Sequence, residues 1–246
     1  SGSRCGYPPH SGLNRSLPFP LQAALGNAAG WLMALRPGRR RRIAETNLAL
    51  CFPDVPAATR RRWLRQNYQA SMRAALEYGV LWFASAARVR RIVRIDNPEA
   101  ALGDGVRPVI WLAPHFLGLD MGGVRLTMDY RMASMYAPAK DPVTDRYVRH
   151  GRTRFADIVL IARHEGLKAT LNAIRSMRPF YYLPDQDHGR HNAVFVPFFG
   201  VSAATVSALP RLAKLTNAQV VPVITRQRPW GRGYAVRFYP PWENYP

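Results

Sequence analysis

The sequence predicts an α/β fold with a central, mostly parallel sheet flanked by helices, preceded by an N-terminal membrane-associated helix. Short apolar runs with β-branched residues alternate with stretches of helical periodicity over most of the chain, which is the pattern of parallel strands joined by helices. Near the N-terminus a charge-free segment precedes a run of arginines, which is typical of a helix that meets a membrane. With 246 residues, 48% of them hydrophobic, the chain can build one large core or two small ones.

The N-terminal part is expected to differ from the rest of the chain. Residues 1–16 are expected to be disordered or an expression remnant. Residues 17–35 carry no charge over about the length that crosses a bilayer, but two prolines, a Gln and an Asn dilute their hydrophobicity, so a spanning helix and an interfacial or buried helix both stay open. The basic segment 36–42, RPGRRRR, is typical of a juxtamembrane cluster that stays cytoplasmic. We therefore assign 17–52 to a membrane-associated unit and 53–246 to the main domain.

The charge balance indicates a polyanionic partner. Thirty-five Lys and Arg against fifteen Asp and Glu give a net charge of +20. Nucleic acid, an anionic membrane surface and an acidic carrier protein all satisfy this charge. The aromatic residues lie in apolar periodic runs and no common nucleic-acid motif is visible, which argues against a basic nucleic-acid-binding module. Cys5 and Cys51 form no zinc pattern, which favours free thiols in a reducing compartment.

The main domain opens with a long amphipathic helix. Apolar residues recur at three- and four-residue steps from Ala57 to Phe83, and Thr59 is the expected cap within the turn PDVPAAT. Further helices are predicted in FLGLDMGGVRLTMDY, EGLKATLNAIRSM and VSALPRLAKLTNA. Strands are predicted in VRPVIWLAP, RMASMYAP, DIVLIA, FYYLPDQ, QVVPVIT and YAVRFYP.

His115 and Asp120 are the candidate catalytic pair. His115 directly follows a predicted strand, where open α/β sheets place their ligand sites, and Asp120 comes five positions later. A carboxylate that orients an imidazole makes it a general base for a substrate hydroxyl. By spacing alone a structural histidine is the commoner outcome. The chain has no GxSxG or HExxH motif and no cysteine beside a histidine, so direct attack of a hydroxyl on an activated acyl group remains.

Four blocks in order carry a resemblance to a known family: RRRIAETNLALCFPD, APHFLGLDMGG, MYAPAKDPVTDRYVRHGRTRF and YYLPDQDHGRHNAVFVPFFGVSAATVSALPRLA. With them the chain resembles the late acyltransferases of lipid A biosynthesis, the lauroyl and myristoyl transferases, within the glycerol-phosphate acyltransferase superfamily. The resemblance implies a glycerol-phosphate acyltransferase-like fold, with 53–246 as the acyltransferase domain. Many members have Glu at the position of Asp120, and members usually continue beyond a segment like YPPWENYP, so a longer natural C-terminus is expected.

The resemblance also implies the chemistry and the setting. Acyl carrier protein would deliver the acyl group as a thioester, and a hydroxyl of a lipid A precursor would accept it. His115 and Asp120 would be catalytic, with neither a cofactor nor a metal. The enzyme would work at the cytoplasmic face of the bacterial inner membrane, with anionic lipids and no nucleic acid as partners. A glycerophospholipid or an ornithine lipid stays open as the acceptor, because HFLGLDMGG does not distinguish between them.

The remaining candidate site residues are assigned to substrate binding. Arg152 and Arg154, in a block with Lys140, suit bidentate contacts with phosphate or an oxyanion, although a solvated basic face is the alternative. Three further candidates emerge after the predicted strand FYYL, where acceptor binding is expected and a hard metal is the weaker alternative: Asp185, Gln186 and Asp187. Two more lie in FVPFFG, which suits an acyl groove as well as an ordinary core: Phe199 and Gly200.

Overall fold

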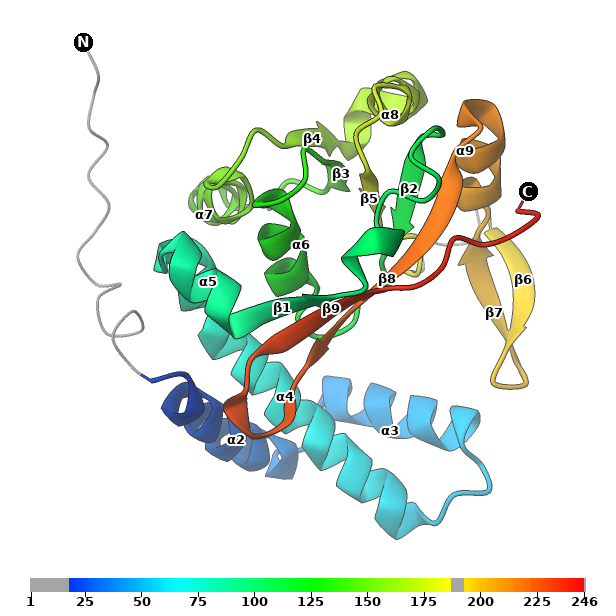
Figure 1. Cartoon of the computed structure of the whole chain (residues 1–246). Coiled ribbons are helices and arrows are strands. Elements are labelled where there is room, and N and C mark those ends of the chain that lie inside the picture. The colour runs from blue at the N-terminus through cyan, green and yellow to red at the C-terminus, as the bar shows by residue number, and fades with distance from the viewer. Residues whose placement is uncertain (1–17, 187–192, 246) are drawn as a thin grey trace.

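The computed structural model describes residues 18–186 and 193–245 (Figure 1). The predicted segment 1–16 and Asp187 therefore lie outside the described residues. A seven-stranded sheet runs through the upper part of the molecule in Figure 1 in the order β1-β9-β8-β2-β5-β3-β4. Its strands are β1 (Val93–Asp96), β2 (Val109–Leu112), β3 (Ala133–Tyr136), β4 (Val159–Ala162), β5 (Phe180–Tyr182), β8 (Gln219–Gln227) and β9 (Tyr234–Phe238).

The sheet is mostly parallel, as the alternating pattern predicts. Five of the six strand pairings are parallel, and the pairing of β8 with β9 is antiparallel. Each of the six predicted strands is confirmed. The chain leaves β2, builds β3 and β4 on one side, and returns to place β5 between β2 and β3 before β8 pairs on the other side of β2. Strand order therefore reverses around β2, which is where α/β sheets form ligand crevices.

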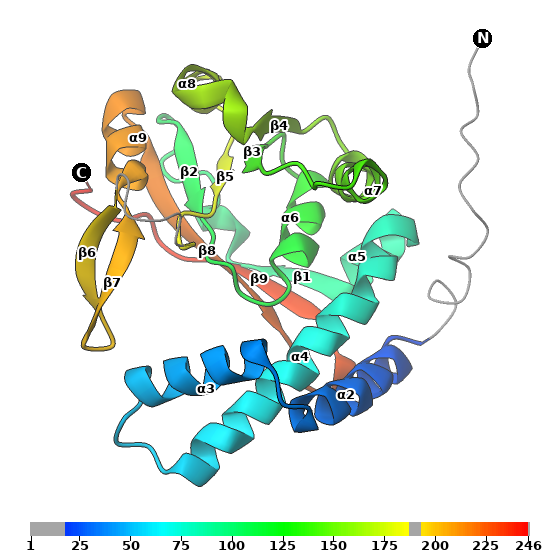
Figure 2. The ribbon, with the colours of Figure 1, turned by 180° about the vertical axis from the view of Figure 1, so that it is seen from behind.

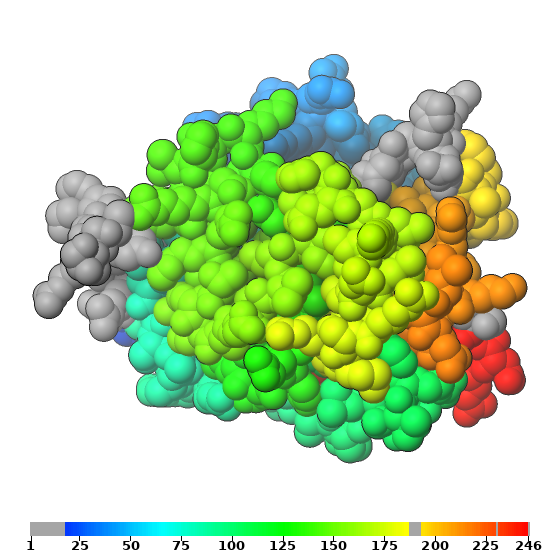
Figure 3. Space-filling view, turned by 90° about the horizontal axis from the view of Figure 1, so that it is seen from above, coloured from blue at the N-terminus to red at the C-terminus, as the bar shows by residue number. Residues whose placement is uncertain are grey.

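Helices cover both faces of the sheet. Side chains alternate along each strand, so the strands present apolar side chains to both faces, and both must be covered. Trp111 belongs to a core on one face with residues of α4, α5 and α6, whereas Ile110 belongs to a core on the other face with residues of α8 and α9. Figure 3 shows the segments between β3 and β5, in green to yellow, and α9, in orange, covering the upper end of the molecule. These helices are α4 (Ala57–Phe83), α5 (Ala86–Ile92), α6 (Leu119–Thr127), α7 (Pro142–Thr153), α8 (Gly166–Arg175) and α9 (Ala208–Thr216).

The long helix α4 has the predicted bounds, but the predicted cap is wrong. The N-cap is Pro56, with an extended backbone and no side-chain hydrogen bond. Thr59 lies inside the first turn, and its backbone nitrogen already donates to the Pro56 carbonyl at 2.9 Å. Short 3-10 turns complete the body: η2 (Pro98–Ala100), η3 (Arg163–Glu165) and η4 (Pro229–Gly231).

At the lower end in Figure 1, α2 (Phe19–Leu35) and α3 (Arg39–Cys51) pack against α4 (Figure 2). The approach of α2 to α4 requires glycine. A Cβ at Gly26 would come within 2.6 Å of the Cα of Arg73, and one at Gly30 would come within 2.4 Å of the Cα of Gln69. The helical prediction for 17–35 is confirmed. No described helix is both long and apolar enough to cross a bilayer, so a membrane role of α2 stays a prediction.

Several elements are missing from the sequence prediction, among them β1, α7 and a hairpin. Residues 193–206 form an antiparallel hairpin of β6 (Ala193–Phe198) and β7 (Val201–Val206), which lies beside the main sheet (Figures 1 and 2). The segment VFVPFF is continuously apolar, which resembles a buried segment rather than an alternating strand. Phe199 and Gly200 form the turn between the two strands. Both residues are exposed, belong to neither core, and do not line the main cavity described below.

Candidate active site

The site lies where β2 and β5 end side by side. In the parallel register of these strands Leu112 pairs with Tyr182. His115 and Asp185 each follow their paired residue by three positions. Neighbouring parallel strands thus deliver the two side chains to the same edge of the sheet. The prediction that His115 lies at the carboxyl end of a strand is confirmed, although Ala113 and Pro114 separate it from the last residue of β2.

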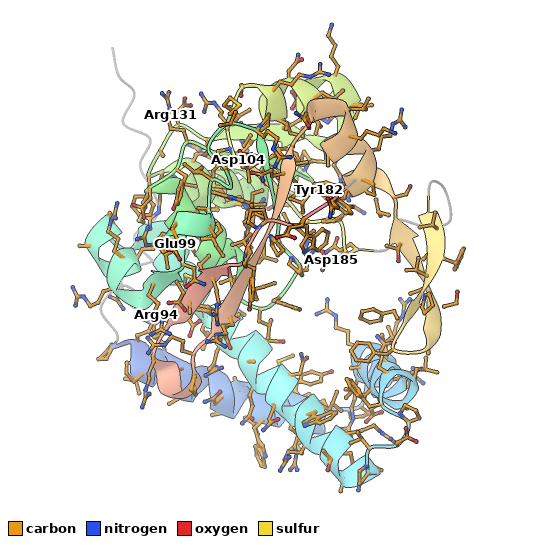
Figure 4. The ribbon with its side chains drawn as sticks, turned by 45° about the vertical axis from the view of Figure 1, so that its right-hand side comes forward. Arg94, Glu99, Asp104, Arg131, Tyr182 and Asp185 are labelled. Atoms are coloured by element: carbon orange, nitrogen blue, oxygen red, sulfur yellow. The ribbon has the colours of Figure 1, made fainter. Side chains whose placement is uncertain are left out.

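Asp185 holds both the ring and the backbone of His115. Its Oδ1 lies 2.6 Å from Nδ1 of the imidazole, and its Oδ2 accepts from the His115 backbone nitrogen at 2.7 Å. The side chains of His115 and Asp185 are 31% and 39% exposed, so a ligand can reach them. A carboxylate at Nδ1 favours the tautomer with the proton on that nitrogen, which leaves the lone pair on Nε2. Figure 4 shows Asp185 at the edge of the sheet, above α4.

Asp120 takes part in a second cluster. It lies in the first turn of α6, where the helix dipole favours negative charge. Nη2 and Nε of Arg152, on α7, donate to its Oδ1 at 2.8 and 3.2 Å, and the hydroxyl of Tyr78, on α4, donates to its Oδ2 at 2.5 Å. Burial and the charge of Asp120 raise the pKa of Tyr78 above its usual range, so this hydroxyl stays protonated and donates.

The two clusters differ from the predicted pairing of His115 with Asp120. Among the described residues, the carboxylate that contacts the imidazole is Asp185, while donors from α4 and α7 engage both oxygens of Asp120. The participation of His115 and Asp120 in catalysis stays a prediction.

A cavity of about 890 Å³ joins the two clusters. His115, Asp120 and Arg152 line it together with Gln186. Aliphatic and aromatic side chains form most of the remaining wall: Tyr78, Leu119, Val124, Met132, Met135, Tyr136, Ala137, Ile158, Leu160, Tyr181, Tyr182, Leu183, Pro184 and Val206. The cavity has the size and the mainly apolar lining, with a few converging polar groups, of a small-molecule site.

Other predicted site residues lie outside this cavity. Lys140 is exposed in the turn before α7, and Phe199 and Gly200 form the hairpin turn. Arg154 is directed towards α4: its Nη2 donates to the Val80 carbonyl at 3.2 Å. Burial lowers the pKa of Arg154 to about 10. The phosphate contact predicted for Arg154 therefore requires a different side-chain position.

Sequence reasoning did not single out Tyr78, which carries no local signal. Its role depends on α4 crossing α6 at Asp120, a contact between residues 42 positions apart. Ser134 and Arg163 also line the cavity without having been predicted. Residues of this kind become site residues only through packing between elements.

A buried polar network supports the turn that carries His115. Gly118 has φ 94°, and a Cβ there would come within 2.3 Å of the ring of Tyr234. The hydroxyl of Tyr234 donates to Glu77, which is 2% exposed, and accepts from Nε2 of Gln227 at 3.0 Å. Burial raises the pKa of Glu77 to about 7, against the opposing effects of the Tyr234 hydrogen bond and the charge of Arg73.

Glu77 is expected to make stability fall with rising pH. Between its ordinary pKa of 4.5 and about 7 the folded state keeps a proton that the unfolded state releases, so the free energy of unfolding decreases over this range by roughly 3 kcal/mol. Glu77→Gln, which cannot ionise, should remove most of this decrease. Urea denaturation at pH 5 and pH 8 measures it, with the exposed Glu45→Gln as the control. Equal pH dependence in Glu77→Gln and the wild type would contradict the assignment.

The fold and the site together define a class of protein. A parallel α/β sheet presents a carboxylate-bound histidine at its carboxyl edge, beside a mostly apolar cavity. This arrangement is typical of enzymes in which a base meets an apolar substrate.

The comparisons with known proteins identify the family. Residues 12–246 match the family model of the bacterial lipid A biosynthesis acyltransferases. The chain is 31% identical over 229 residues to a lipid A biosynthesis acyltransferase of Haemophilus influenzae, covering 92% of this chain and 73% of that protein. It is 31% identical over 228 residues to the lipid A biosynthesis lauroyltransferase of Escherichia coli, covering 92% and 74%. It is 32% identical over 209 residues to the lipid A biosynthesis myristoyltransferase of Escherichia coli, covering 83% of this chain and 62% of that protein.

The chain belongs to the bacterial lipid A biosynthesis acyltransferase family, which confirms the resemblance carried by the four sequence blocks. It is therefore an acyltransferase. The members compared above transfer different acyl groups according to their names, so family membership leaves the acyl group of this chain open.

Proposed function

We propose that this chain transfers a fatty acyl group from the thioester of acyl carrier protein to a hydroxyl of a lipid A precursor. The observation that carries the proposal is the placement of His115, bound to a carboxylate, on the wall of a large and mostly apolar cavity. Such a cavity can hold an acyl chain, and an imidazole at the end of a strand can take the proton of a hydroxyl nucleophile. The relatives named for lauroyl, myristoyl and palmitoleoyl transfer in lipid A biosynthesis support the acceptor.

In the proposed reaction Nε2 of His115 takes the proton of the acceptor hydroxyl as its oxygen attacks the thioester carbonyl. A carbon–oxygen bond forms, the carbon–sulfur bond breaks, and the imidazolium returns its proton to the departing thiolate. Asp185 accepts from Nδ1 and stabilises the imidazolium that forms between these steps. The reaction needs no metal and no prosthetic group, and acyl carrier protein is the co-substrate.

Arg152 is the proposed contact for negative charge in the cavity. Nε and Nη2 of Arg152 both donate to one carboxylate oxygen of Asp120, which fixes the plane of the guanidinium. Nη1 makes no hydrogen bond to the residues that the structure describes and is left for a substrate phosphate or for the oxyanion formed at the thioester carbonyl. The sequence pairing of Asp120 with His115 is the alternative role for this carboxylate.

The proposed setting is the cytoplasmic face of the bacterial inner membrane. A net charge of +20 suits both an acidic carrier protein and anionic lipid headgroups, and no nucleic-acid partner is proposed. An acyltransferase of lipid precursors must reach both partners at a membrane surface.

The test is mass spectrometry of lipid A from cells that lack the gene. We expect a species smaller by one acyl group, and its mass difference identifies the missing chain. Expression of the chain should restore the larger species, and a vector without the gene is the control. Unchanged lipid A, or a change confined to glycerophospholipids or ornithine lipids, would refute the acceptor.

A further inference from the structure

In the hairpin of β6 and β7, strand β6 is apolar on both faces and no residue is buried. Its fourteen residues, 193–206, contain no charged side chain in a chain of net charge +20. Three successive residues, Val194, Phe195 and Val196, are 48%, 58% and 38% exposed. Because neighbouring side chains of a strand point to opposite faces, both faces of β6 present apolar side chains to the surroundings. A hairpin in water would carry polar residues on at least one face.

The turn of the hairpin strengthens this observation. Phe199 and Gly200 have φ of 50° and 76°, so both central residues of the two-residue turn are left-handed. This turn favours Asn-Gly, and a bulky aromatic residue rarely adopts the conformation. The ring gains little burial from it, since Phe199 is 55% exposed and Phe198 beside it is 58% exposed. Two phenylalanines at the hairpin tip thus keep more than half of their surface exposed.

The neighbouring helix supplies the complementary charge. Phe199 contacts Phe52, directly after α3, with ring centroids 5.0 Å apart. Figures 1 and 2 show the hairpin and α3 side by side. No residue of α3 is buried. Ile43 and Leu50 are 49% and 51% exposed and lie seven residues apart, hence on one face of the helix. Exposed arginines lie in the first turn of α3: Arg39, Arg40 and Arg42.

We propose that the hairpin tip and α3 form a lipid-docking surface, in which Phe198 and Phe199 enter the acyl region of a bilayer and the arginines of α3 bind anionic headgroups. Exposed apolar side chains bordered by arginines complement an anionic membrane surface, whereas an acidic protein partner would complement the arginines alone. The inference rests on the proposed function only for its lipid substrate, and it assigns the surface that meets the bilayer.

This surface connects directly to the catalytic edge. The chain runs from β5 and Asp185 into β6, and Val206, the last residue of β7, lines the large cavity. Figure 4 shows Asp185 between the sheet and the hairpin. Docking of the hairpin thus holds the histidine edge beside the bilayer that contains the acceptor.

Co-sedimentation with vesicles tests the docking surface. The variant Phe199→Asn removes the ring and introduces the residue that this turn prefers, so the hairpin should keep its fold. We expect its partition constant on vesicles of equal parts phosphatidylglycerol and phosphatidylcholine to fall about tenfold. The matched control is Met177→Asn, because Met177 is also left-handed, with φ 59°, and 51% exposed, but lies at the turn between α8 and β5.

The charge component has its own variant. Replacement of Arg39, Arg40 and Arg42 together by Gln should weaken binding to the same vesicles and reduce its salt dependence, with little effect on vesicles of phosphatidylcholine alone. Circular dichroism and the Tm of each variant establish that it is folded.

Unchanged vesicle binding of Phe199→Asn, or an equal loss in Met177→Asn, would overturn the proposal. A dimer in light scattering that Phe199→Asn abolishes, with vesicle binding intact, would assign the tip to a second copy of the chain instead. Vesicle binding requires no turnover, so a chain that binds vesicles and acylates no lipid A precursor would refute the proposed function alone.

Discussion

Replacement of His115 by alanine is expected to lower kcat about 10³-fold, the range that a positioned general base contributes. The side chain is 31% exposed and its ring hydrogen bond goes to an exposed carboxylate, so the Tm should change little. Loss of turnover with an intact fold is the result that distinguishes a catalytic imidazole from the structural histidine that the His-x4-Asp spacing also allows.

The measurement is steady-state transfer from acyl carrier protein to a purified lipid A precursor, followed by mass spectrometry. His164→Ala is the matched control, because His164 is exposed in η3 and does not line the cavity. A His115→Ala enzyme within a few-fold of the wild type would contradict the assignment of the base. A similar loss in His164→Ala would point to a general effect of removing a surface imidazole.

The sequence was sufficient to place His115 but not its partner. Apolar β-branched runs and the histidine that follows one of them are local features, and the structure confirms both. The contact with Asp185 depends on β5 pairing with β2 although β3 and β4 come between them in the chain. That order follows from how α6, α7 and α8 cross the sheet, which no spacing in the sequence records.

The hairpin illustrates a different limit. A continuous apolar run has the same composition whether it is buried in a core, lines an acyl groove or faces a bilayer. The groove and the core were the two interpretations of FVPFFG, and the described hairpin fits neither, because Phe198 and Phe199 are more than half exposed. Burial is a property of the surrounding elements and had to come from the structure.

The second large effect is expected at the two carboxylates, and it separates their roles. Asp185→Asn should lower kcat by about 10²- to 10⁴-fold with little change in KM, because an amide facing Nδ1 favours the tautomer that carries its proton on Nε2. Asp120→Asn should mainly raise KM for the lipid acceptor, because it loosens Arg152 without touching the imidazole. Both variants replace a carboxylate by an amide of the same shape, so each is the control for the other.

Combination with His115→Ala shows which carboxylate acts through the imidazole. Residues that work as a unit are strongly non-additive. If Asp185 orients the base, the variant His115→Ala/Asp185→Asn should be no slower than His115→Ala, whereas adding Asp120→Asn should still weaken acceptor binding. The reverse pattern, with Asp120→Asn silent in the His115→Ala background, would restore the pairing that the sequence predicts. The contacts of Asp120 with Tyr78 and Arg152 would then have to exchange for the imidazole when substrate binds.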